Sequence, residues 1–292
     1  MSEPRRLNSP ALVAVLLAAA MLFAGLLVLP SFWLTSSDEV VVYTALDYDF
    51  SAPIFEEFTR RTGIDVRAKY DTESTKTVGL TQALLAEADR PRCDLFWNNE
   101  ILNTLRLQRA GLLRSYESPA GADYPAMYRD ADGQWYGFAA RARILLVNTD
   151  LLPEADRPKT LAELTEEPWR GRVAMAKPLF GTTATHAACL FAKWGDAPAR
   201  EFFESLKAND VQVLAGNRQV AAAVAAGQAA VGLTDTDDAM VEIAAGSPVA
   251  IVYPDQGDDG LGTLFIPNTL ALIKGGPNPE NTARLVEFLL SP

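Results

Sequence analysis

The stretch Ala229-Ala-Val-Gly-Leu-Thr-Asp-Thr-Asp-Asp-Ala-Met-Val-Glu-Ile-Ala-Ala245 shows the succession of elements that is most informative about the fold of this chain. An apolar run, typical of a strand buried in a parallel sheet, leads into a polar turn at Asp235 to Asp238 and then into a helical pattern. Carboxylates gathered at such a turn either face a cleft that captures a ligand or cap a solvated helix. The function of the chain depends on which of these alternatives holds.

Short apolar runs alternate with helical patterns on both sides of this stretch. Because strands and helices take turns along the chain, we expect parallel strands joined by right-handed crossovers. The expected strands are 40–44, 64–69, 94–97, 144–148, 172–176, 211–214, 229–234, 249–253 and 263–273. The expected helices are 51–62, 75–88, 101–110, 183–194, 197–209, 218–226, 239–245 and 279–290.

The sequence therefore predicts an α/β fold of two lobes, each a mainly parallel sheet flanked by helices. The long apolar strand near the end of the chain suits a return into the first lobe, so that the second lobe is inserted in the first. The predicted boundaries are residues 38–140 with 264–292 for lobe 1 and residues 141–263 for lobe 2. Connecting strands are expected near residues 138–146 and 263–270.

Residues 1–37 read as a targeting segment. Arg5 and Arg6 precede Ala11 to Leu29, nineteen residues without a charge. A basic start before an apolar block is typical of an export signal, and this block is also long enough to span a membrane as a helix. A cleaved signal peptide and an uncleaved anchor through residues 11–29 both stay open. Both place the rest of the chain in the periplasm or at the extracytoplasmic face of the membrane.

Composition narrows the classes of function. The net charge of −11 argues against nucleic acid and anionic membrane surfaces as partners, because both need a basic footprint. A single histidine, His186, argues against imidazole-rich zinc sites and catalytic triads. We expect no enzyme, although a hydrolase with Asp237 as base and Glu100 as acid is an alternative. Cys93 and Cys189 are expected to be two buried free thiols, with a disulfide as the alternative.

Four turns that follow strands carry polar side chains. In open parallel sheets ligands bind beyond the carboxyl ends of the strands, so these turns are candidates for a common cleft. Asp47, Asn99 and Asp235 are equally suited to cap helices, which is the alternative for each turn taken alone. The candidate ligand-binding residues of these turns are Asp47, Asn99, Glu100, Gly181, Thr182, Thr183, Asp235, Asp237 and Asp238.

Two further features favour an anion. Gly181-Thr182-Thr183 offers backbone N–H groups and hydroxyls at a helix start, which is either an anion seat or an ordinary threonine cap. Arg141 and Arg143 lie at the predicted hinge and point the same way along a strand. They could grip one carboxylate, phosphate or carbonate, or form a structural ion pair across the hinge.

Together these segments resemble the periplasmic substrate-binding proteins of ABC importers, in particular the ferric-iron-binding branch of the extracellular solute-binding proteins. The resemblance runs from about Val40 to the end. It rests on Val42-Tyr-Thr44, Phe55-Glu-Glu-Phe-Thr-Arg-Arg-Thr-Gly-Ile64, Asp94-Leu-Phe-Trp97, Ala140-Arg-Ala-Arg143, Trp169-Arg-Gly-Arg-Val173 and Val224-Ala-Ala-Gly-Gln-Ala-Ala-Val-Gly-Leu233. It implies a two-lobed type II periplasmic-binding-protein fold, preceded here by an N-terminal hydrophobic helix.

The resemblance also implies a site. The family's first metal ligand falls at Asp47, its glutamate at Asn99 with Glu100 adjacent, and its anion-holding turn at Gly181-Thr182-Thr183. Its anion-contacting arginine falls at Arg141 or Arg143. Its two adjacent tyrosines, whose phenolates bind iron, are replaced here by Asp237-Asp238. The expected metal ligands are Asp47, Glu100, Asp237 and Asp238, because carboxylate oxygens still suit hard cations.

We therefore expect a monomeric binding protein that closes two lobes over a ligand and delivers it to an ABC-importer permease in the inner membrane. The expected cargo is ferric iron, Fe(III), with a synergistic anion. The alternatives are a small polar or phosphorylated organic solute as cargo, or a membrane-anchored ligand sensor of the same fold.

Overall fold

The computed structural model describes residues 38–71 and 77–291. The chain divides into two units, 1–38 and 39–292, and the fold described below belongs to the second unit. The predicted signal peptide or anchor lies outside the described residues, as does the beginning of the helix predicted from residue 75. Within the described part of the chain, no helix has both the length and the apolarity to cross a membrane.

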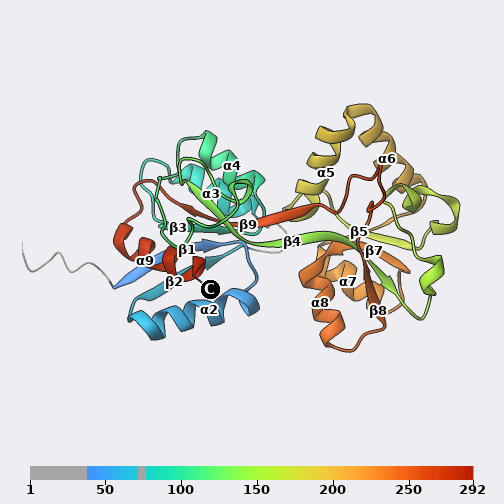
Figure 1. Cartoon of the computed structure of the whole chain (residues 1–292), viewed down its shortest axis with the longest axis horizontal. Helices are drawn as coiled ribbons and strands as arrows, with labels where there is room; N and C mark the ends of the chain where they lie inside the picture. The colour runs from blue at the N-terminus through green and yellow to red at the C-terminus, as the bar shows by residue number, and fades with distance from the viewer. Residues whose placement is uncertain (1–37, 72–76, 292) are drawn as a thin grey trace, which may run out of the picture. The chain divides into compact units, whose positions relative to one another are not determined.

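The first sheet contains the beginning and the end of the described chain (Figure 1). Strand β1 (Glu39–Thr44) pairs in parallel with β2 (Asp65–Tyr70) and β3 (Leu95–Asn98), and β9 (Phe265–Leu272) pairs antiparallel to β3. Their apolar side chains form a core with Phe58 and Trp97 inside it. The accompanying helices are α2 (Tyr48–Thr62), α3 (Val78–Ala86), α4 (Leu102–Arg109) and α9 (Pro279–Leu290).

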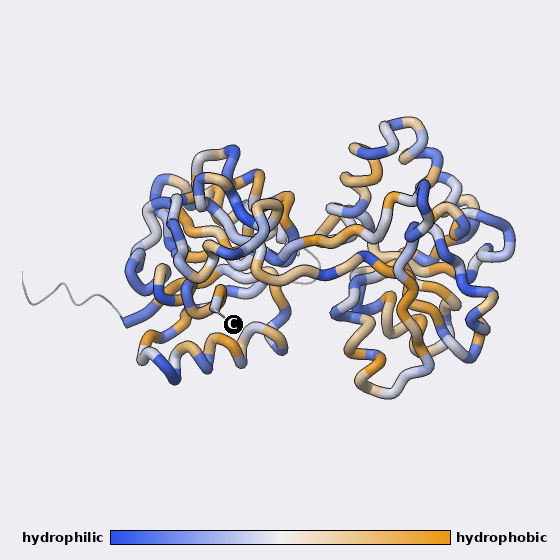
Figure 2. Tube along the Cα trace, viewed as in Figure 1, coloured by the Kyte–Doolittle hydropathy of each residue, from blue (hydrophilic) through white to orange (hydrophobic). Residues whose placement is uncertain are grey.

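Helix α2 shows why such a segment folds as it does. Its buried residues, Ser51, Ala52, Phe55 and Phe58, recur at helical spacing, and hydrophobic and hydrophilic residues alternate along its tube in Figure 2. Gly63 ends the helix at a φ of 75°, a left-handed conformation that glycine adopts without strain.

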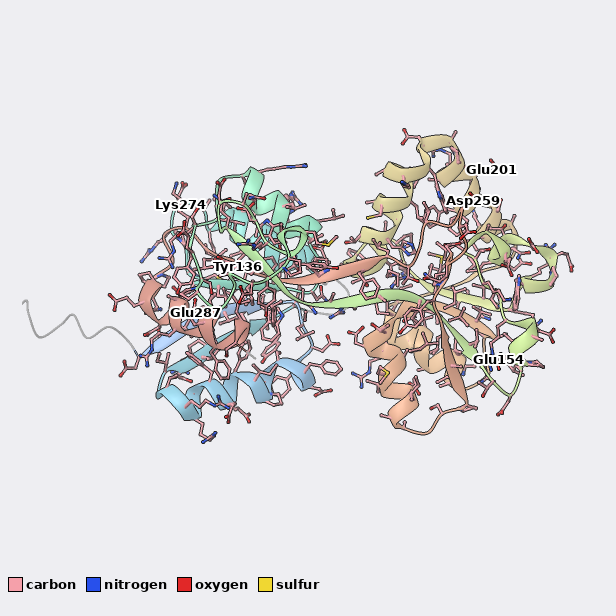
Figure 3. All side chains as sticks on the ribbon, viewed as in Figure 1. Tyr136, Glu154, Glu201, Asp259, Lys274 and Glu287 are labelled. Atoms are coloured by element: carbon pink, nitrogen blue, oxygen red, sulfur yellow. The ribbon has the colours of Figure 1, made fainter. Side chains whose placement is uncertain are left out.

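Helix α9 is hydrogen-bonded to the loop that precedes the hinge strand, β4 (Trp135–Asn148). Glu287 of α9 accepts hydrogen bonds from the Tyr116 hydroxyl (2.9 Å) and the Ala120 N–H (3.0 Å). Tyr136, which Figure 3 labels together with Glu287, donates its hydroxyl proton to the Tyr116 carbonyl (2.6 Å). Burial and the Glu287 carboxylate raise the pKa of Tyr116 to about 12, so this hydroxyl stays a donor at neutral pH. The last helix thus belongs to the same core as the first strand.

The second sheet is built from the middle of the chain. Strand β5 (Val173–Ala176) pairs in parallel with β6 (Gln212–Leu214) and with β7 (Val231–Asp235), while β8 (Val249–Val252) lies antiparallel to the hinge strand. Its core includes Leu145, Leu164 and Leu206. The helices of this part are α5 (Gly181–Trp194), α6 (Asp196–Ala208), α7 (Asn217–Ala225) and α8 (Thr236–Ala244).

One strand, β4 (Trp135–Asn148), joins the two sheets. It pairs antiparallel with β9 as far as Ala142, and from Arg143 onward with β7. An apolar strand was expected at 144–148 and a connecting strand near 138–146, and β4 contains both and begins earlier, at Trp135. The nine strands thereby form one hydrogen-bonded path, β2-β1-β3-β9-β4-β7-β5-β6, with β8 beside β4.

The predicted α/β fold with mainly parallel strands and flanking helices is confirmed. Each antiparallel pair among the described strands includes β4 or β9: β3 with β9, and β4 with β7, β8 and β9. The residue boundaries proposed for the two lobes stay a prediction.

Candidate functional site

A small pocket lies where the turns after several strands meet. Its volume is about 40 Å³. Asp47 and Asn99 reach it from the turns after β1 and β3, and Arg141 reaches it from β4. The second part of the chain supplies the other lining residues, Ala176, Lys177, Phe180, Gly181, Thr182, Thr183, Ala215, Gly216, Asn217, Arg218, Asp235, Asp237 and Asp238.

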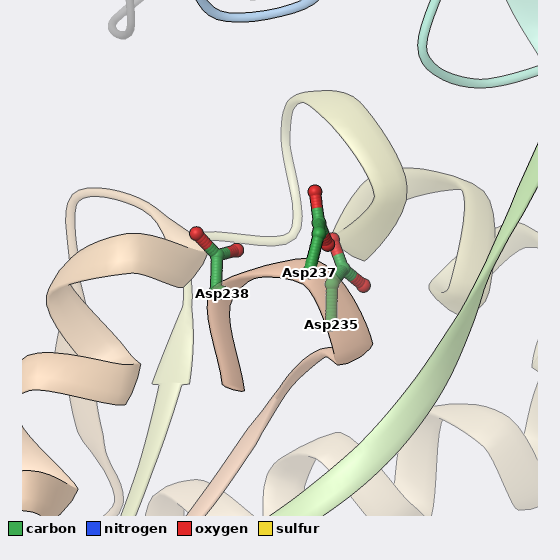
Figure 4. Close-up of side chains that lie close together, drawn as sticks. All are labelled: Asp235, Asp237 and Asp238. Atoms are coloured by element: carbon green, nitrogen blue, oxygen red, sulfur yellow. The ribbon is translucent and has the colours of Figure 1, made fainter. Parts of the chain in front are cut away.

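The acidic turn that follows β7 forms one wall of this pocket. Asp235, Asp237 and Asp238 lie side by side at the start of α8 (Figure 4), and one carboxylate oxygen of each lies within 4.8 Å of the others. Asp235 precedes the first residue of the helix, but its side chain makes no capping hydrogen bond to it. The three carboxylates are therefore not explained by helix capping alone.

Asp235 is a structural member of the trio. It is 1 % exposed and accepts from Arg143 Nη1 (2.6 Å), the Thr182 hydroxyl (2.5 Å) and Asn217 Nδ2 (2.9 Å). Arg143 and Asp235 also face each other across β4 and β7. Both oxygens of Asp235 are thus occupied, and its role is to tie α5 and α7 to the two strands.

Arg143 does not line the pocket among the described residues. Its side chain is fully buried and held by Asp235, and its Nη1 also donates to Asn217 Oδ1 (3.1 Å). The two arginines therefore do not bind one anion together, as was expected, because only Arg141 lines the pocket. Arg143 instead makes the structural ion pair of the alternative, though with a strand neighbour in the second sheet and not across the hinge.

Asp237 is the carboxylate that faces the pocket from beside Arg141. Its Oδ2 lies 3.0 Å from Arg141 Nη1, while its Oδ1 is buried with no hydrogen-bond partner in the described part of the chain. Burial raises the pKa of Asp237 above the usual aspartate range and Asp235 adds to this, while Arg141 opposes it. Asp238 lines the pocket next to it and is partly buried.

Asn99 and Glu100 lie in different places despite being neighbours. Asn99 is 2 % exposed and lines the pocket, and its Oδ1 has no hydrogen-bond partner among the described residues. Glu100 does not line the pocket: its carboxylate accepts from the Leu102 N–H (2.6 Å) and the Asn103 N–H (3.0 Å) at the start of α4. It also accepts from the Thr185 hydroxyl of α5 (3.0 Å).

Glu100 therefore caps the start of α4. Asn99 was the residue expected to cap this helix, and Glu100 was expected to bind the metal. The cap is favoured because two N–H groups at a helix start need acceptors. Of the four expected metal ligands, Asp47, Asp237 and Asp238 reach the pocket and Glu100 does not.

The start of α5 has the character of an anion seat. Gly181 opens the helix with a φ of 54°, and the Ala184 N–H makes the first bond of the helix, to the Phe180 carbonyl (3.1 Å). The N–H groups of residues 181–183 precede that bond and belong to the first helical turn, whose donors have no acceptor within the helix. The hydroxyls point elsewhere, because Thr182 donates to Asp235 and Thr183 to Asn217 (3.0 Å).

Three pocket residues with polar side chains were missed by the sequence analysis. Asn217 and Arg218 open α7 after Gly216, and Lys177 follows β5 directly. The stretch Ala215-Gly216-Asn217 has the same strand-to-helix character as the four turns that were chosen, so position alone could have indicated it. Among the described residues, three cationic side chains line the pocket: Arg141, Lys177 and Arg218.

The sole histidine and the cysteines do not line this pocket. His186 is 5 % exposed, and its Nδ1 accepts from Arg143 Nε (3.4 Å). Burial first, and then the Arg143 charge, lower the pKa of His186 to about 3, so the ring is neutral in the folded protein. Both cysteines are free: Cys93 is buried, but Cys189 is only half-buried, unlike the expectation of two buried thiols.

Residues 99–292 match the family described as bacterial extracellular solute-binding protein. This chain belongs to that family. Iron uptake protein A1 of Synechocystis is 24% identical over 265 residues, covering 87% of this chain and 71% of the relative. The Fe(3+)-binding periplasmic protein of Serratia marcescens is 27% identical over 224 residues, covering 76% of this chain and 63% of that protein.

Solved structures show the same fold. Iron-bound HitA from Pseudomonas aeruginosa superimposes with a TM-score of 0.79 at 24% identity, over 87% of this chain and 81% of that one. The periplasmic binding protein AfuA from Actinobacillus pleuropneumoniae, with fructose-6-phosphate bound, has a TM-score of 0.75 at 21% identity, over 87% and 79%. The chain is thus an extracytoplasmic solute-binding protein of the ABC-importer type and not an enzyme.

Proposed function

We propose that this solute-binding protein captures ferric iron together with a small anion and delivers them to the permease of an ABC importer. The observation that carries the proposal is the pair of unpartnered buried acceptors, Asp237 Oδ1 and Asn99 Oδ1, on the lining of one pocket. A buried oxygen without a donor is costly, and a bound cation satisfies it. The two oxygens come from opposite sheets, so one cation could engage both.

The remaining donors fit a hard cation. Asp47 and Asp238 place two further carboxylates on the same pocket lining. Oxygen-only ligand sets suit hard cations, whereas a nitrogen or sulfur set would favour zinc or copper. Among the described lining residues there is no histidine, cysteine or tyrosine. The proposed metal ligands are therefore Asp47, Asn99, Asp237 and Asp238.

The anion would occupy the start of α5. Backbone N–H groups of Gly181, Thr182 and Thr183, the helix dipole and the guanidinium of Arg141 all favour negative charge there. Such an anion would complete the coordination of a cation held by few protein oxygens. A volume of about 40 Å³ has room for only a few water-sized groups, which suits a metal ion with a small anion. The names of the relatives from Synechocystis and Serratia support iron as the metal.

A phosphorylated organic solute is the second candidate. It is favoured by the three cationic lining residues and the helix start, which would bind a phosphate without any metal. The absence of tyrosine from the described lining also removes the phenolates that the ferric branch was expected to use. In this case Asp237 and Asn99 would accept hydrogen bonds from hydroxyl groups of the solute.

The two candidates are separated by thermal unfolding of the full-length chain with ferric citrate, citrate alone, inorganic phosphate and fructose-6-phosphate. We expect ferric citrate to raise the unfolding temperature, since a ligand at one hundred times its dissociation constant adds about 2.7 kcal/mol. Asp237→Asn should abolish the shift, whereas Asp259→Asn, an exposed control outside the pocket, should keep it. A shift with fructose-6-phosphate and none with ferric citrate would overturn the iron proposal.

A further inference from the structure

A second pocket lies beside α5 and is much larger than the first. Its volume is about 550 Å³, and none of the described residues lines both pockets. Pockets of about 300–1,000 Å³ are typical of sites for small organic molecules. The second pocket therefore has room for an organic molecule, which the first pocket does not.

One face of α5 forms a wall of this second pocket. His186, Cys189, Leu190 and Lys193 all line it. They recur at spacings of three and four residues, which places them on the same side of a helix. The start of α5 thus borders the first pocket, and its later turns border the second.

The rest of the lining comes from segments that are far apart in the sequence, and it is largely apolar. Met127 and Tyr128 precede β4, whereas residues 261–265 follow β8. Met127, Leu261 and Phe265 are 74 %, 41 % and 53 % exposed. A single exposed apolar side chain is ordinary, but these three border one pocket, so an apolar occupant would remove several of them from water together.

His186 gives this apolar lining a buried hydrogen-bond donor. The side chain is 5 % exposed, and its Nδ1 accepts from Arg143 Nε (3.4 Å), so the neutral ring carries its proton on Nε2. In the described part of the chain no group accepts from this N–H, and the ring lines the second pocket. A buried donor without an acceptor is costly, and an oxygen atom of an occupant would satisfy it.

The charged residues of the lining favour an anion. Lys193 is exposed and has neither an ion pair nor a hydrogen bond within the described residues. Asp255 already accepts from the Leu161 N–H (3.3 Å), and burial raises its pKa above the usual aspartate range. A negative group near Lys193 would therefore gain an attraction without displacing any partner.

We propose that the second pocket binds an apolar organic anion, with an oxygen atom on the His186 N–H and the charged group near Lys193. The apolar body would lie against Cys189 and Leu190 of α5. This site goes beyond the proposed cargo and does not depend on its identity, because the two pockets have no described lining residue in common.

Calorimetry on the full-length chain tests the chemistry of the occupant. Dansylglycine serves as the probe, because it joins an apolar ring system and sulfonyl oxygens to a carboxylate, and dansylamide is the matched probe without the carboxylate. We expect one equivalent of dansylglycine to bind about two- to fivefold more tightly than dansylamide, as suits one charge pair at an exposed position. Lys193→Gln should remove this preference, whereas Lys207→Gln, an exposed lysine of α6 outside the pocket, should keep it.

A second pair of variants tests the location. Cys189→Phe places a ring inside the pocket and should abolish dansylglycine binding. The matched control is Ala188→Phe, at an exposed neighbouring position of α5 that does not line the pocket, and it should bind as the natural chain does.

Alkylation of the natural chain keeps the test decisive if Cys189→Phe does not fold. Burial raises the pKa of the Cys189 thiol, so its reaction with N-ethylmaleimide is followed by mass spectrometry at about pH 8.5. Saturating dansylglycine should slow this reaction at least about fivefold, because it covers the thiol. Cys93 is fully buried and should stay unmodified, which makes it an internal control for the folded state.

The outcomes separate this site from the proposed function. Dansylglycine binding that persists in Cys189→Phe, or alkylation of Cys189 at an unchanged rate, would overturn the site. Displacement of dansylglycine by ferric citrate without any protection of Cys189 would place the probe in the first pocket and overturn it as well. Protection of Cys189 in a chain that shows no thermal shift with ferric citrate would support this site and overturn only the iron proposal.

Discussion

At the scale of single residues, the site separates structural charges from charges that line the pocket. Asp235 and Arg143 lie two positions from Asp237 and Arg141, and each aspartate pairs with its arginine, but only the Asp235–Arg143 pair is closed off from solvent at both side chains. Arg141 and Arg143 lie on the same face of β4, because side chains two apart on a strand point the same way. They differ in burial because Arg143 lies deeper in the second sheet. Sequence spacing identified all four residues, but it could not tell which pair would be buried.

The buried histidine makes the stability of the protein depend on pH. His186 has a pKa of about 3 in the folded protein and near 6.5 when unfolded. Below about pH 6.5 the unfolded chain binds a proton that the folded protein does not, so the free energy of unfolding decreases as the pH falls toward about 3. The slope for this one group is at most about 1.4 kcal/mol per pH unit.

Urea unfolding of the natural chain and of His186→Gln between about pH 7.5 and 4.5 would measure this contribution. The variant retains an acceptor for Arg143 Nε but cannot be protonated, so we expect its unfolding free energy to fall less steeply below about pH 6.5. His186 is the only histidine in the chain, so a difference in slope reports on this position. Parallel curves for the two proteins would contradict the expectation.

At the scale of elements, the sequence predicted the strands and helices better than the contacts among them. Runs such as Val40 to Thr44 and the helical spacing of α2 indicate their elements directly, because burial on one face imposes a period. The extent of β4 was not predictable in this way. Ala139 to Ala142 is a strand only because β9 supplies its hydrogen-bond partners from far along the sequence.

The candidate site shows the same division. Turns after strands could be chosen from the sequence, and Asp47, Asn99 and Asp237 do line one pocket. Glu100 was assigned to the metal because the resemblance places it next to the position of the family's glutamate. In the structure its carboxylate accepts from the Leu102 N–H and from the Thr185 hydroxyl, and the second of these contacts is set by tertiary structure. Asn217 could have been chosen from its strand-to-helix turn, but its hydrogen bonds with Asp235 and Thr182 could not, because these residues lie on two other elements.

Packing between α7 and β7 leaves no room for a side chain at Gly232. A Cβ atom added there would lie 2.6 Å from Val220 Cγ1 and 2.8 Å from Val224 Cγ2. We expect Gly232→Ala to push α7 away from the sheet and to lower the free energy of unfolding by about 1–3 kcal/mol. Chemical denaturation measures the change.

The matched control is Gly257→Ala, where an added Cβ would meet nothing within 4 Å. Its unfolding free energy should stay within about 0.5 kcal/mol of the natural chain. Because α7 carries Asn217 and Arg218 into the pocket, Gly232→Ala should also weaken ligand binding. A variant as stable as the control would show that α7 can shift without cost.

At the scale of the whole described chain, ligand binding and hinge motion are expected to be one event. Pocket residues come from the turns after β1 and β3 and from the turns of the second sheet, so a ligand that contacts both draws them together. We expect small-angle scattering of the full-length chain to show a smaller radius of gyration with ferric citrate. Asp237→Asn should show no such decrease. An unchanged radius in the natural chain, at a concentration of ferric citrate that shifts its unfolding temperature, would argue against closure.

The position of β9 in the first sheet has a consequence for biosynthesis. This strand lies between β3 and β4, and α9 packs on the same core, although both follow β8 in the sequence and are made after it. The stretch from β5 to β8, by contrast, is contiguous in sequence. As the polypeptide emerges from the ribosome or a translocation pore, the segment from β5 to β8 can become compact before β9 is available to pair with β3. A chain that terminates near residue 262 would therefore leave the first sheet incomplete, and we expect its amino-terminal half to aggregate and to be cleaved by proteases.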